Sequence, residues 1–315
     1  MKTKRHLLQI CLLYAAMLPA VVQAQFLLTT NSDGSLNISK YTGSGGVVTI
    51  PSTTNGLPIT SIGTNAFYGS FFYFSVIIGT NVTSIDYDAF AACNYLTNAV
   101  IPSSVTSIGY GAFGDCYKLT SITIPNSVTN IGDLAFYKCI AMTSITIPNG
   151  VTSIGYETFD GCASLTNITI PSSVTSIGTN AFYHCTSLKG IYFLGNAPAV
   201  GLSVFLYDST LTAYYLPGTT GWIAFAANTG LTTALWFLPN PLILNNEPSF
   251  GVQTNVFGFT ISWATNTSVV VEGSTNLANP VWQPVSTNTL TGGTSYFSDP
   301  QWTNYPGQFY RLRSP

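Results

Sequence analysis

Apolar residues in the middle of the chain return every 23 residues, with Ser, Thr and Asn between them. The clearest series are Ile62, Ile85, Ile108, Ile131, Ile154 and Ile177, then Phe67, Phe90, Phe113, Phe136, Phe159 and Phe182, then Cys93, Cys116, Cys139, Cys162 and Cys185. A constant period of about 20–29 residues with apolar side chains at set offsets is the signature of a solenoid, in which each repeat forms one turn.

The first part of each repeat alternates as a half-buried strand does. Leu119, Ile122 and Ile124 are apolar, whereas Ser121 and Thr123 between them are polar. Because successive side chains of a strand point to opposite faces, this pattern predicts a strand with one buried face.

The second part of the repeat returns the chain to the start of the next strand. Pro125 ends the first strand because it lacks the amide proton that a sheet needs. Val128 and Ile131 form a second inward pair, and Gly132 permits a tight corner. We expect a short helical turn over Ala135–Cys139, with its apolar side chains inside the coil.

A string of residues extends this pattern over the middle of the chain. The string I-P-x-x-V-T-x-I-G-x-x-A-F-x-x-C-x-x-L runs from Ile59 to about Leu188. It resembles the BspA-type leucine-rich repeat of bacterial surface proteins. The resemblance implies an α/β repeat, a strand-dominated leucine-rich-repeat solenoid of 23-residue units, and adhesion to a host or matrix for some relatives. Asp86 departs from the string at the corner glycine, and Asp208 stands where a further cysteine is expected.

Both ends of the solenoid are expected to carry caps, because an open end exposes unpaired strand edges. Residues 25–58 contain two turns between short strand-like runs, the first at Asn31–Gly34, and are predicted to form the N-terminal cap. The solenoid is assigned to residues 59–240, including degenerate repeats after Leu188.

The last part of the chain has a different pattern. Residues 241–249 break the period and are predicted to be a linker. Residues 250–315 contain short strand-like runs separated by turn residues, which predicts a small antiparallel β-sandwich module. This stretch resembles a C-terminal module of other secreted bacterial proteins, and the resemblance implies no particular activity.

Residues 1–24 have the pattern of a signal peptide. Lys2, Lys4 and Arg5 precede an apolar run, and Val22-Gln23-Ala24 provides a small-residue cleavage site. We therefore expect a secreted or cell-surface protein. No later apolar run is long enough for a transmembrane helix.

Charged residues make up only 6% of the chain. Loss of the signal peptide would remove three basic residues and change the net charge from −2 to −5. Lys118, Lys138 and Lys189 stand alone in separate repeats. A weakly acidic chain without clustered Lys and Arg argues against nucleic acid as a partner.

The five cysteines after residue 24 are expected to be buried thiols. Equivalent positions in adjacent turns lie about 4.8 Å apart, a separation that permits a disulfide. Parallel side-chain directions and the odd number of cysteines instead favour free thiols that pack as small apolar groups.

No set of residues has the pattern of a catalytic site. His184 adjoins Cys185, but His184 occupies a variable position expected to face solvent, whereas Cys185 points inward. Asp133, Glu157 and Asp160 fall at different offsets and are expected to be solvated loop residues, not a facing pair of acids. Zinc would need closely spaced ligands such as C-x-x-C. We therefore predict that the protein is not an enzyme and has no metal site or cofactor.

The outward face of the predicted strands is the candidate binding surface, and we call it the exposed strand strip. Its residues are Val100, Thr123, Thr146, Thr169 and Tyr192 in one row and Asn98, Ser121, Ser144 and Asn167 in the other. Solenoids use such extended surfaces for binding. The competing interpretation is that threonine, being β-branched, simply suits a strand.

These patterns predict a secreted or cell-surface, non-enzymatic binding protein. We expect its strip to engage another protein or a glycan, with adhesion as the biological role, and we expect a monomer. One alternative is a structural spacer of the cell envelope that presents the C-terminal module. Another is a protein that binds ice or a crystal surface through regularly spaced threonines.

Overall fold

A computed structural model describes residues 25–43, 45–70, 73–208, 210–236, 241–244, 250–253, 256–263, 267–304 and 307–313. The predicted signal peptide, residues 1–24, lies outside the described residues. The chain divides into two compact units. The first comprises residues 1–168, 176–189 and 200–210, and the second comprises residues 169–175, 190–199 and 211–315.

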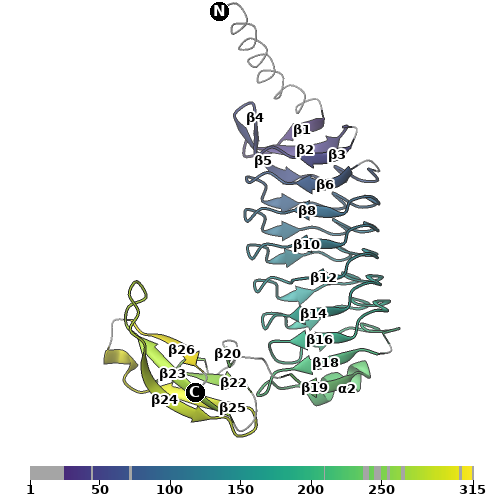
Figure 1. Ribbon diagram of the computed structural model, residues 1–315. Coiled ribbons are helices and arrows are strands. Elements are labelled where there is room, and N and C mark those ends of the chain that lie inside the picture. The colour runs from purple at the N-terminus through teal and green to yellow at the C-terminus, as the bar shows by residue number, and fades with distance from the viewer. Residues whose placement is uncertain are drawn as a thin grey trace, which may run out of the picture. The chain divides into compact units, whose positions relative to one another are not determined.

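Strands dominate the repeats, and most turns contribute one strand to each of two kinds of parallel sheet (Figure 1). One sheet contains β3 (Gly46–Thr49), β6 (Tyr73–Ile77), β8 (Asn98–Val100), β10 (Ser121–Thr123) and β12 (Ser144–Ile145). The other contains β2 (Leu36–Tyr41), β5 (Leu57–Ile62), β7 (Ser84–Ile85), β9 (Ser107–Ile108) and β11 (Asn130–Ile131). The predicted strand-dominated solenoid is confirmed.

The later repeats form two further parallel sheets. One contains β13 (Ser153–Ile154), β15 (Ser176–Ile177) and β17 (Ala199–Val200). The other contains β14 (Asn167–Ile170), β16 (Gly190–Phe193), β18 (Thr212–Tyr215) and β19 (Thr232–Leu235).

The N-terminal residues close the first turn with a hairpin. β1 (Phe26–Thr30) pairs antiparallel with β2 around the Asn31–Gly34 turn, in which the Asp33 carboxylate accepts hydrogen bonds from the backbone and hydroxyl of Ser35. β4 (Thr53–Thr54) pairs antiparallel with β5.

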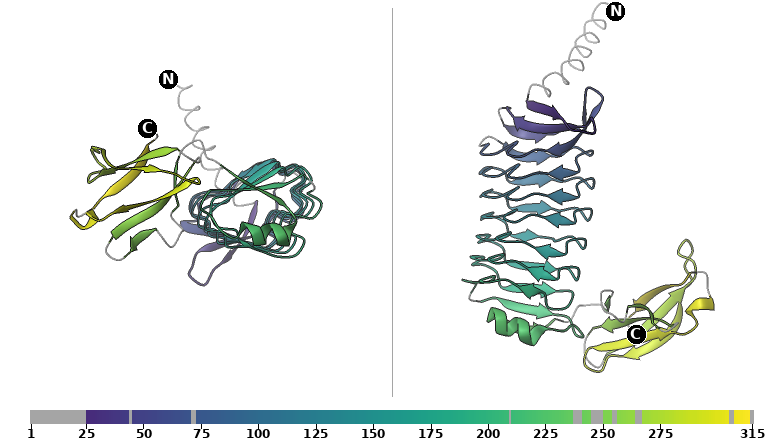
Figure 2. Two further views of the ribbon diagram at one scale, coloured as in Figure 1. Left: turned by 90° about the horizontal axis from the view of Figure 1, so that it is seen from below. Right: turned by 180° about the vertical axis from the view of Figure 1, so that it is seen from behind.

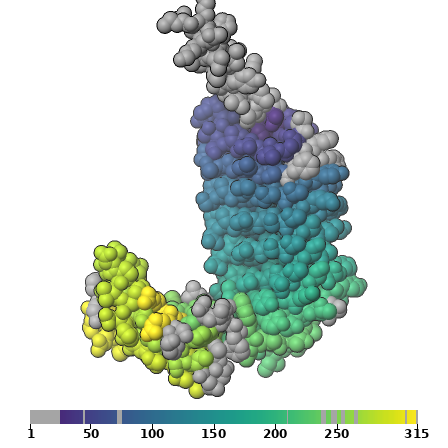
Figure 3. All heavy atoms as spheres, in the orientation of Figure 1, coloured from purple at the N-terminus to yellow at the C-terminus, as the bar shows by residue number. Residues whose placement is uncertain are grey.

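The strand register repeats without slippage through the middle of the first unit. Ser121 of β10 lies opposite Asn98 of β8 on one side and Ser144 of β12 on the other. Each of these residues is 23 positions from the next, so the sequence period is also the length of one structural turn. Seen along the axis, the turns of the first unit overlie one another (Figure 2), and the space-filling view shows them as close-packed layers (Figure 3).

A column of stacked phenylalanines fills the interior of the first unit. The rings of Phe67, Phe90, Phe113, Phe136, Phe159, Phe182 and Phe205 stack on one another in that order. Neighbouring ring centroids are 4.6–5.7 Å apart, within the range of favourable offset stacking. Each ring is at most 7% exposed. The predicted inward position of this series is therefore confirmed.

The corners differ from the prediction of a short helical turn over Ala135–Cys139. Leu134 and Lys138 have positive φ angles of 56° and 52°, and equivalent residues of the other turns share this left-handed conformation. An α-helix cannot continue through such residues. Their N–H groups and that of Phe136 donate instead to carbonyls of the next turn: Leu134 to Tyr156, Phe136 to Thr158 and Lys138 to Asp160.

Close contact between turns favours glycine at the corners of Gly109 and Gly132, although Asp86 occupies the equivalent corner of an earlier turn. A Cβ atom at Gly132 would lie 2.5 Å from the backbone nitrogen of Tyr110, and one at Gly109 would lie 2.7 Å from the carbonyl carbon of Asp86. A side chain at these positions would therefore force adjacent turns apart.

In the second unit, a short helix covers apolar side chains of the late repeats. α2 (Trp222–Thr229) begins after Gly221 and ends at Gly230, both with positive φ. Trp222 and Phe225 are buried, and their rings lie 5.0 and 5.3 Å from that of Phe193. This is the covering that the end of a solenoid needs.

The second unit also contains two antiparallel sheets, which confirms the expected β-sandwich. One sheet contains β20 (Leu242–Leu244), β21 (Gly251–Gln253), β22 (Val256–Ser262) and β25 (Thr294–Asp299), and the other contains β23 (Ser268–Ser274), β24 (Gln283–Thr289) and β26 (Phe309–Arg313). A 3₁₀ turn, η1, spans Trp302–Asn304. Residues from both sheets form one core: Phe259, Ile261, Val269, Val271, Leu290 and Phe297.

The segment predicted as a linker contributes to this sandwich. Leu242–Leu244 pairs with β22, and Leu244 is only 1% exposed. Because these residues bury apolar side chains and complete a sheet edge, the C-terminal sheet begins before residue 250. Residues 245–249 lie outside the described residues.

Phe136→Ala tests the phenylalanine column. The change removes one ring from between two others, so the free energy of unfolding is expected to fall by about 3–5 kcal/mol. Urea unfolding followed by circular dichroism measures it. Tyr156→Ala, which removes an exposed ring, is the matched control and is expected to cost less than about 1 kcal/mol. Equal losses in the two variants would contradict a packed column.

Candidate functional site

The exposed strand strip begins on β8, β10 and β12 of the first unit. Asn98, Ser121 and Ser144 lie side by side in register and are all exposed. Val100 and Thr123 form the second row, also in register and exposed. Thr146, directly after β12, is exposed as well. These six residues are therefore exposed along neighbouring turns, and their role in binding stays a prediction.

The start of this face is apolar. Ile77 of β6 lies in register with Val100, and these side chains are 40% and 48% exposed. Val47 of β3, in the row of Asn98, is 68% exposed. Large exposed apolar side chains grouped on one face are typical of a contact surface.

The strip residues on β14 and β16 differ in exposure. Asn167 and Thr169 are exposed. Tyr192 is half-buried, because its ring stacks on Tyr214 at 4.9 Å and meets Trp236 edge-on at 4.8 Å. The sequence period had not singled out Trp236. Tyr192 lies opposite Tyr214 and Tyr214 opposite Ala234, so the interval between partners falls below 23 here.

The strip offers hydrogen bonding and apolar contact, not acid–base chemistry. Its side chains are hydroxyls, amides, aliphatic groups and one phenol. A hydroxyl donates and accepts, and an amide does both through separate atoms. Among the described residues, no group of three or more His, Cys, Asp or Glu is placed to hold a metal ion.

The five cysteines form a second interior column, and all are free and buried. Each thiol donates a hydrogen bond of 3.2–3.3 Å to a phenylalanine carbonyl 26 residues earlier: Cys93 to Phe67, Cys116 to Phe90, Cys139 to Phe113, Cys162 to Phe136 and Cys185 to Phe159. Burial raises the pKa of the Cys162 thiol to about 12 and those of Cys116, Cys139 and Cys185 well above the ordinary value. Reactive cysteines need a lowered pKa, so these thiols are structural.

His184 is exposed, as the sequence predicts, and does not act on Cys185. Its ring stacks on Tyr207 with centroids 4.6 Å apart, and its Nδ1 lies 4.0 Å from the Asp160 carboxylate. The Cys185 thiol donates in the opposite direction, to the carbonyl of Phe159. These residues therefore lack the geometry of a nucleophile and base.

Asp160 contradicts the expectation of a solvated loop residue. It is buried, 9% exposed. Burial raises the pKa of its carboxyl to about 6, the negative charge of Glu157 adds to the rise, and His184 and Lys138 oppose it. Asp160 lies in the corner of its repeat, close to Lys138 and His184 of the neighbouring turns. The residues of a single repeat do not reveal this burial.

Asp208 occupies the next position of the cysteine column. It is 4% exposed, and neither carboxylate oxygen has a hydrogen-bond partner among the described residues. Burial raises the pKa of this carboxyl to about 7, the nearby backbone N–H of Cys185 opposes the rise, and the charge of Asp160 adds to it. An ionised carboxylate without a partner is costly inside a protein, so the neutral acid is favoured.

Comparison with known proteins identifies the repeats. A model of the family described as "BspA type Leucine rich repeat region" matches residues 46–140 and 108–233, with six copies. No curated protein matches the chain. The match does not extend to the C-terminal module, whose resemblance to other secreted proteins remains a prediction.

Solved leucine-rich repeat structures resemble the chain. The leucine-rich repeat protein TpLRR of T. pallidum is 31% identical with a TM-score of 0.57, over 60% of this chain and 88% of its own. A leucine-rich repeat protein from Bacteroides ovatus is 23% identical with a TM-score of 0.40, over 67% of this chain and 75% of its own. Among the described residues, no helix has the length and apolar character to cross a membrane.

The buried thiols are expected to resist labelling in the folded protein. Reaction of residues 25–315 with a chromogenic disulfide reagent at pH 8 should release little colour in buffer. In urea it should report the five cysteines, because unfolding exposes their thiols to the reagent. Rapid labelling of the folded protein would contradict the interior column.

Asp208→Cys should remove a pH dependence of stability. The folded state holds the Asp208 proton to about pH 7, whereas the ordinary pKa is 3.8. The contribution of this carboxyl to stability is thus fully present below pH 3.8 and is lost as the pH rises to about 7. The melting temperature of the Asp208→Cys variant should therefore exceed that of the parent by more at pH 8 than at pH 4.

Asp208→Asn is the isosteric control for that measurement. It removes the charge and keeps the shape, so it should show the same pH trend as Asp208→Cys. Shifts in melting temperature that are equal at pH 4 and pH 8 would contradict a buried titrating carboxyl.

Proposed function

Since the chain belongs to the BspA-type leucine-rich repeat family, we propose that it is an exported, non-enzymatic binding protein whose exposed strand strip engages another protein or a glycan. Adhesion is the biological role that this proposal assigns. The observation that carries it is the uncharged outward face made by Asn98, Ser121 and Ser144 beside Val100 and Thr123.

The regular spacing of the strip supports this proposal. Adjacent strands lie about 4.8 Å apart and alternate residues of one strand about 6.6 Å apart. The rows are held by interior columns and by hydrogen bonds between turns, so little conformational freedom is lost when a ligand binds. An extended ligand with its own repeating hydroxyls or amides fits such a surface.

The composition of the strip also determines which interactions can hold a ligand. None of its residues is ionised at neutral pH, so hydrogen bonds and apolar contacts must supply the affinity. Binding through this face should therefore depend weakly on ionic strength, unlike binding through clustered charges.

A spacer role in the cell envelope is the second candidate. The column of stacked phenylalanines gives the first unit a continuous interior, and such a body can hold another module away from a surface. Deletion of residues 250–315 would release the protein from cells if that module anchors it. A strip-binding protein would still capture its ligand after the deletion.

The test of strip binding uses two matched triple variants. Thr123→Lys, Thr146→Lys and Thr169→Lys change the strip, whereas Thr83→Lys, Thr106→Lys and Thr129→Lys change exposed threonines elsewhere in the repeats. Residues 25–315 are applied to a glycan array and a panel of matrix proteins. The strip variant should lose at least tenfold in affinity, because three bulky charges interrupt the rows, and the control should bind like the parent.

Two results would contradict strip binding. One is a parent protein that binds no array component. The other is an equal loss in both triple variants, which would place the binding surface outside the strip. Circular dichroism and melting temperature must match among the three proteins.

A further inference from the structure

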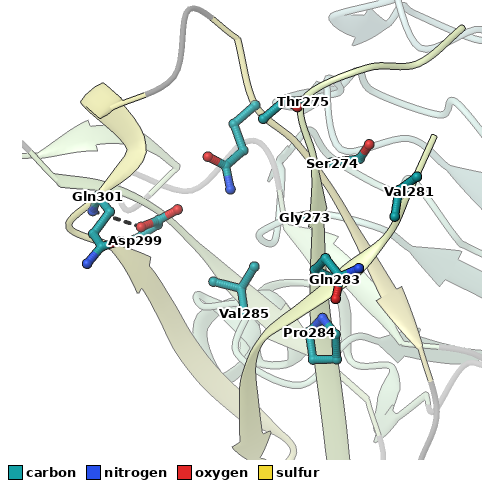
Figure 4. A pocket seen from close by; sticks show the side chains of 10 residues that line it. Gly273, Ser274, Thr275, Val281, Gln283, Pro284, Val285, Asp299 and Gln301 are labelled. Carbon is teal, nitrogen blue, oxygen red and sulfur yellow. Dashed lines mark hydrogen bonds between the residues drawn. The ribbon is translucent and has the colours of Figure 1, made fainter. Parts of the chain in front are cut away.

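The C-terminal module contains a groove that the strip does not use. It lies where β23 and β24 meet the residues between β25 and β26, and its volume is about 320 Å³. Figure 4 shows Asp299 and Gln301 across the groove from Gln283 and Val285. This volume is at the lower end of the range for small-molecule sites, about 300–1,000 Å³.

A glycine keeps the floor of the groove open. Gly273 lies within β23, and its backbone is not in the left-handed region, so its conformation does not require glycine. A Cβ atom there would lie 2.9 Å from Nε2 of Gln308 and 3.0 Å from Cγ2 of Val285. Glycine inside a strand marks a place where another group approaches closely.

One buried polar atom of a residue that lines the groove has no hydrogen-bond partner among the described residues. This atom is Oε1 of Gln308. Buried side-chain oxygens are nearly always hydrogen-bonded, so an unpaired one indicates a missing partner. Gln283, Gln301 and Thr275 add amide and hydroxyl groups to the lining.

The groove offers no cation to a ligand. Asp299 is the ionisable residue among the lining residues, and each of its carboxylate oxygens already accepts one hydrogen bond. Oδ1 accepts the Gln301 N–H at 2.8 Å, and Oδ2 accepts the Tyr310 hydroxyl at 2.7 Å. Arg311 and Arg313 nearby in sequence pair with Glu272 at 2.7 and 2.8 Å. A phosphate or carboxylate ligand would find no unpaired cation among the lining residues.

The strand arrangement disfavours a peptide in this groove. Peptides commonly bind by adding a strand to a free sheet edge. β23 has no such edge, because it pairs with β24 and β26. β24 is an edge strand of this sheet, but its Pro284, which lines the groove, lacks the amide proton that strand addition needs. Side-chain amides and hydroxyls therefore provide the polar contacts, and Val281, Pro284 and Val285 provide an apolar wall.

We propose that this groove binds a small neutral saccharide. A sugar ring combines hydroxyls, which can pair with the amide and hydroxyl side chains of the lining, with a C–H face that suits the apolar wall. The site is separate from the strip, so the proposal does not depend on the function assigned to the solenoid.

The experiment uses residues 25–315 and saturation-transfer NMR. The probes are glucose, galactose, mannose, N-acetylglucosamine and their β-1,4-linked disaccharides, with galacturonic acid and glucose 6-phosphate as charged counterparts. At least one neutral sugar should bind, and each charged counterpart should bind at least tenfold more weakly than its neutral parent.

Three variants locate the binding. Gly273→Ala narrows the floor and Gln308→Leu removes the unpaired acceptor, so each should weaken binding at least tenfold while keeping the parent's melting temperature. Thr287→Ala changes an exposed residue of β24 outside the lining and should bind like the parent, as should the strip triple variant.

Three results would overturn the proposal. They are the absence of binding by every neutral sugar, tighter binding of the charged counterparts, and unchanged binding in both Gly273→Ala and Gln308→Leu. Loss of binding in the strip triple variant alone would assign the sugar to the strip instead.

Discussion

The repeats of this protein depend on the packing of each side chain against its own counterpart in the next turn. Phe113 stacks on Phe90 and Phe136, and the Cys139 thiol donates to the carbonyl of Phe113. Both contacts require an unchanged distance in sequence between partners. The constant period, the in-register strands and the even outward face therefore share one cause: turns of unequal length would separate the partners of every interior column at once.

The fold was predictable because this constraint is visible in the order of residues. Alternation at Ile122 and Ile124 indicated the buried face of a strand, and its outward neighbours Ser121 and Thr123 proved exposed. The corner conformation was not predictable in the same way. Leu134 and Lys138 are not residues that favour positive φ, and what holds them there is hydrogen bonding to the following turn. Such contacts between turns leave no pattern in the local sequence.

The candidate sites also differ in how far the sequence predicts them. The strip follows from the period alone until Tyr192, where a shorter interval brings Tyr214 and Trp236 beside it. The groove of the C-terminal module joins Gly273 to Gln308, which are far apart in sequence and belong to no repeat. The burial of Asp160 likewise comes from neighbouring turns. Positions defined by non-local packing need coordinates, whereas positions defined by periodicity do not.

The uniform junction between turns also bears on how such a protein changes over generations. Each inner turn of the first unit contacts its two neighbours through the same residues, so duplication or excision of one 23-residue segment of the gene would recreate every remaining contact. The hairpin of β1 and β2 must stay at the first end of the solenoid, and the helix α2 must stay at the last. Genetic recombination between copies can therefore lengthen or shorten the exposed strand strip in steps of about 4.8 Å without a new folding problem.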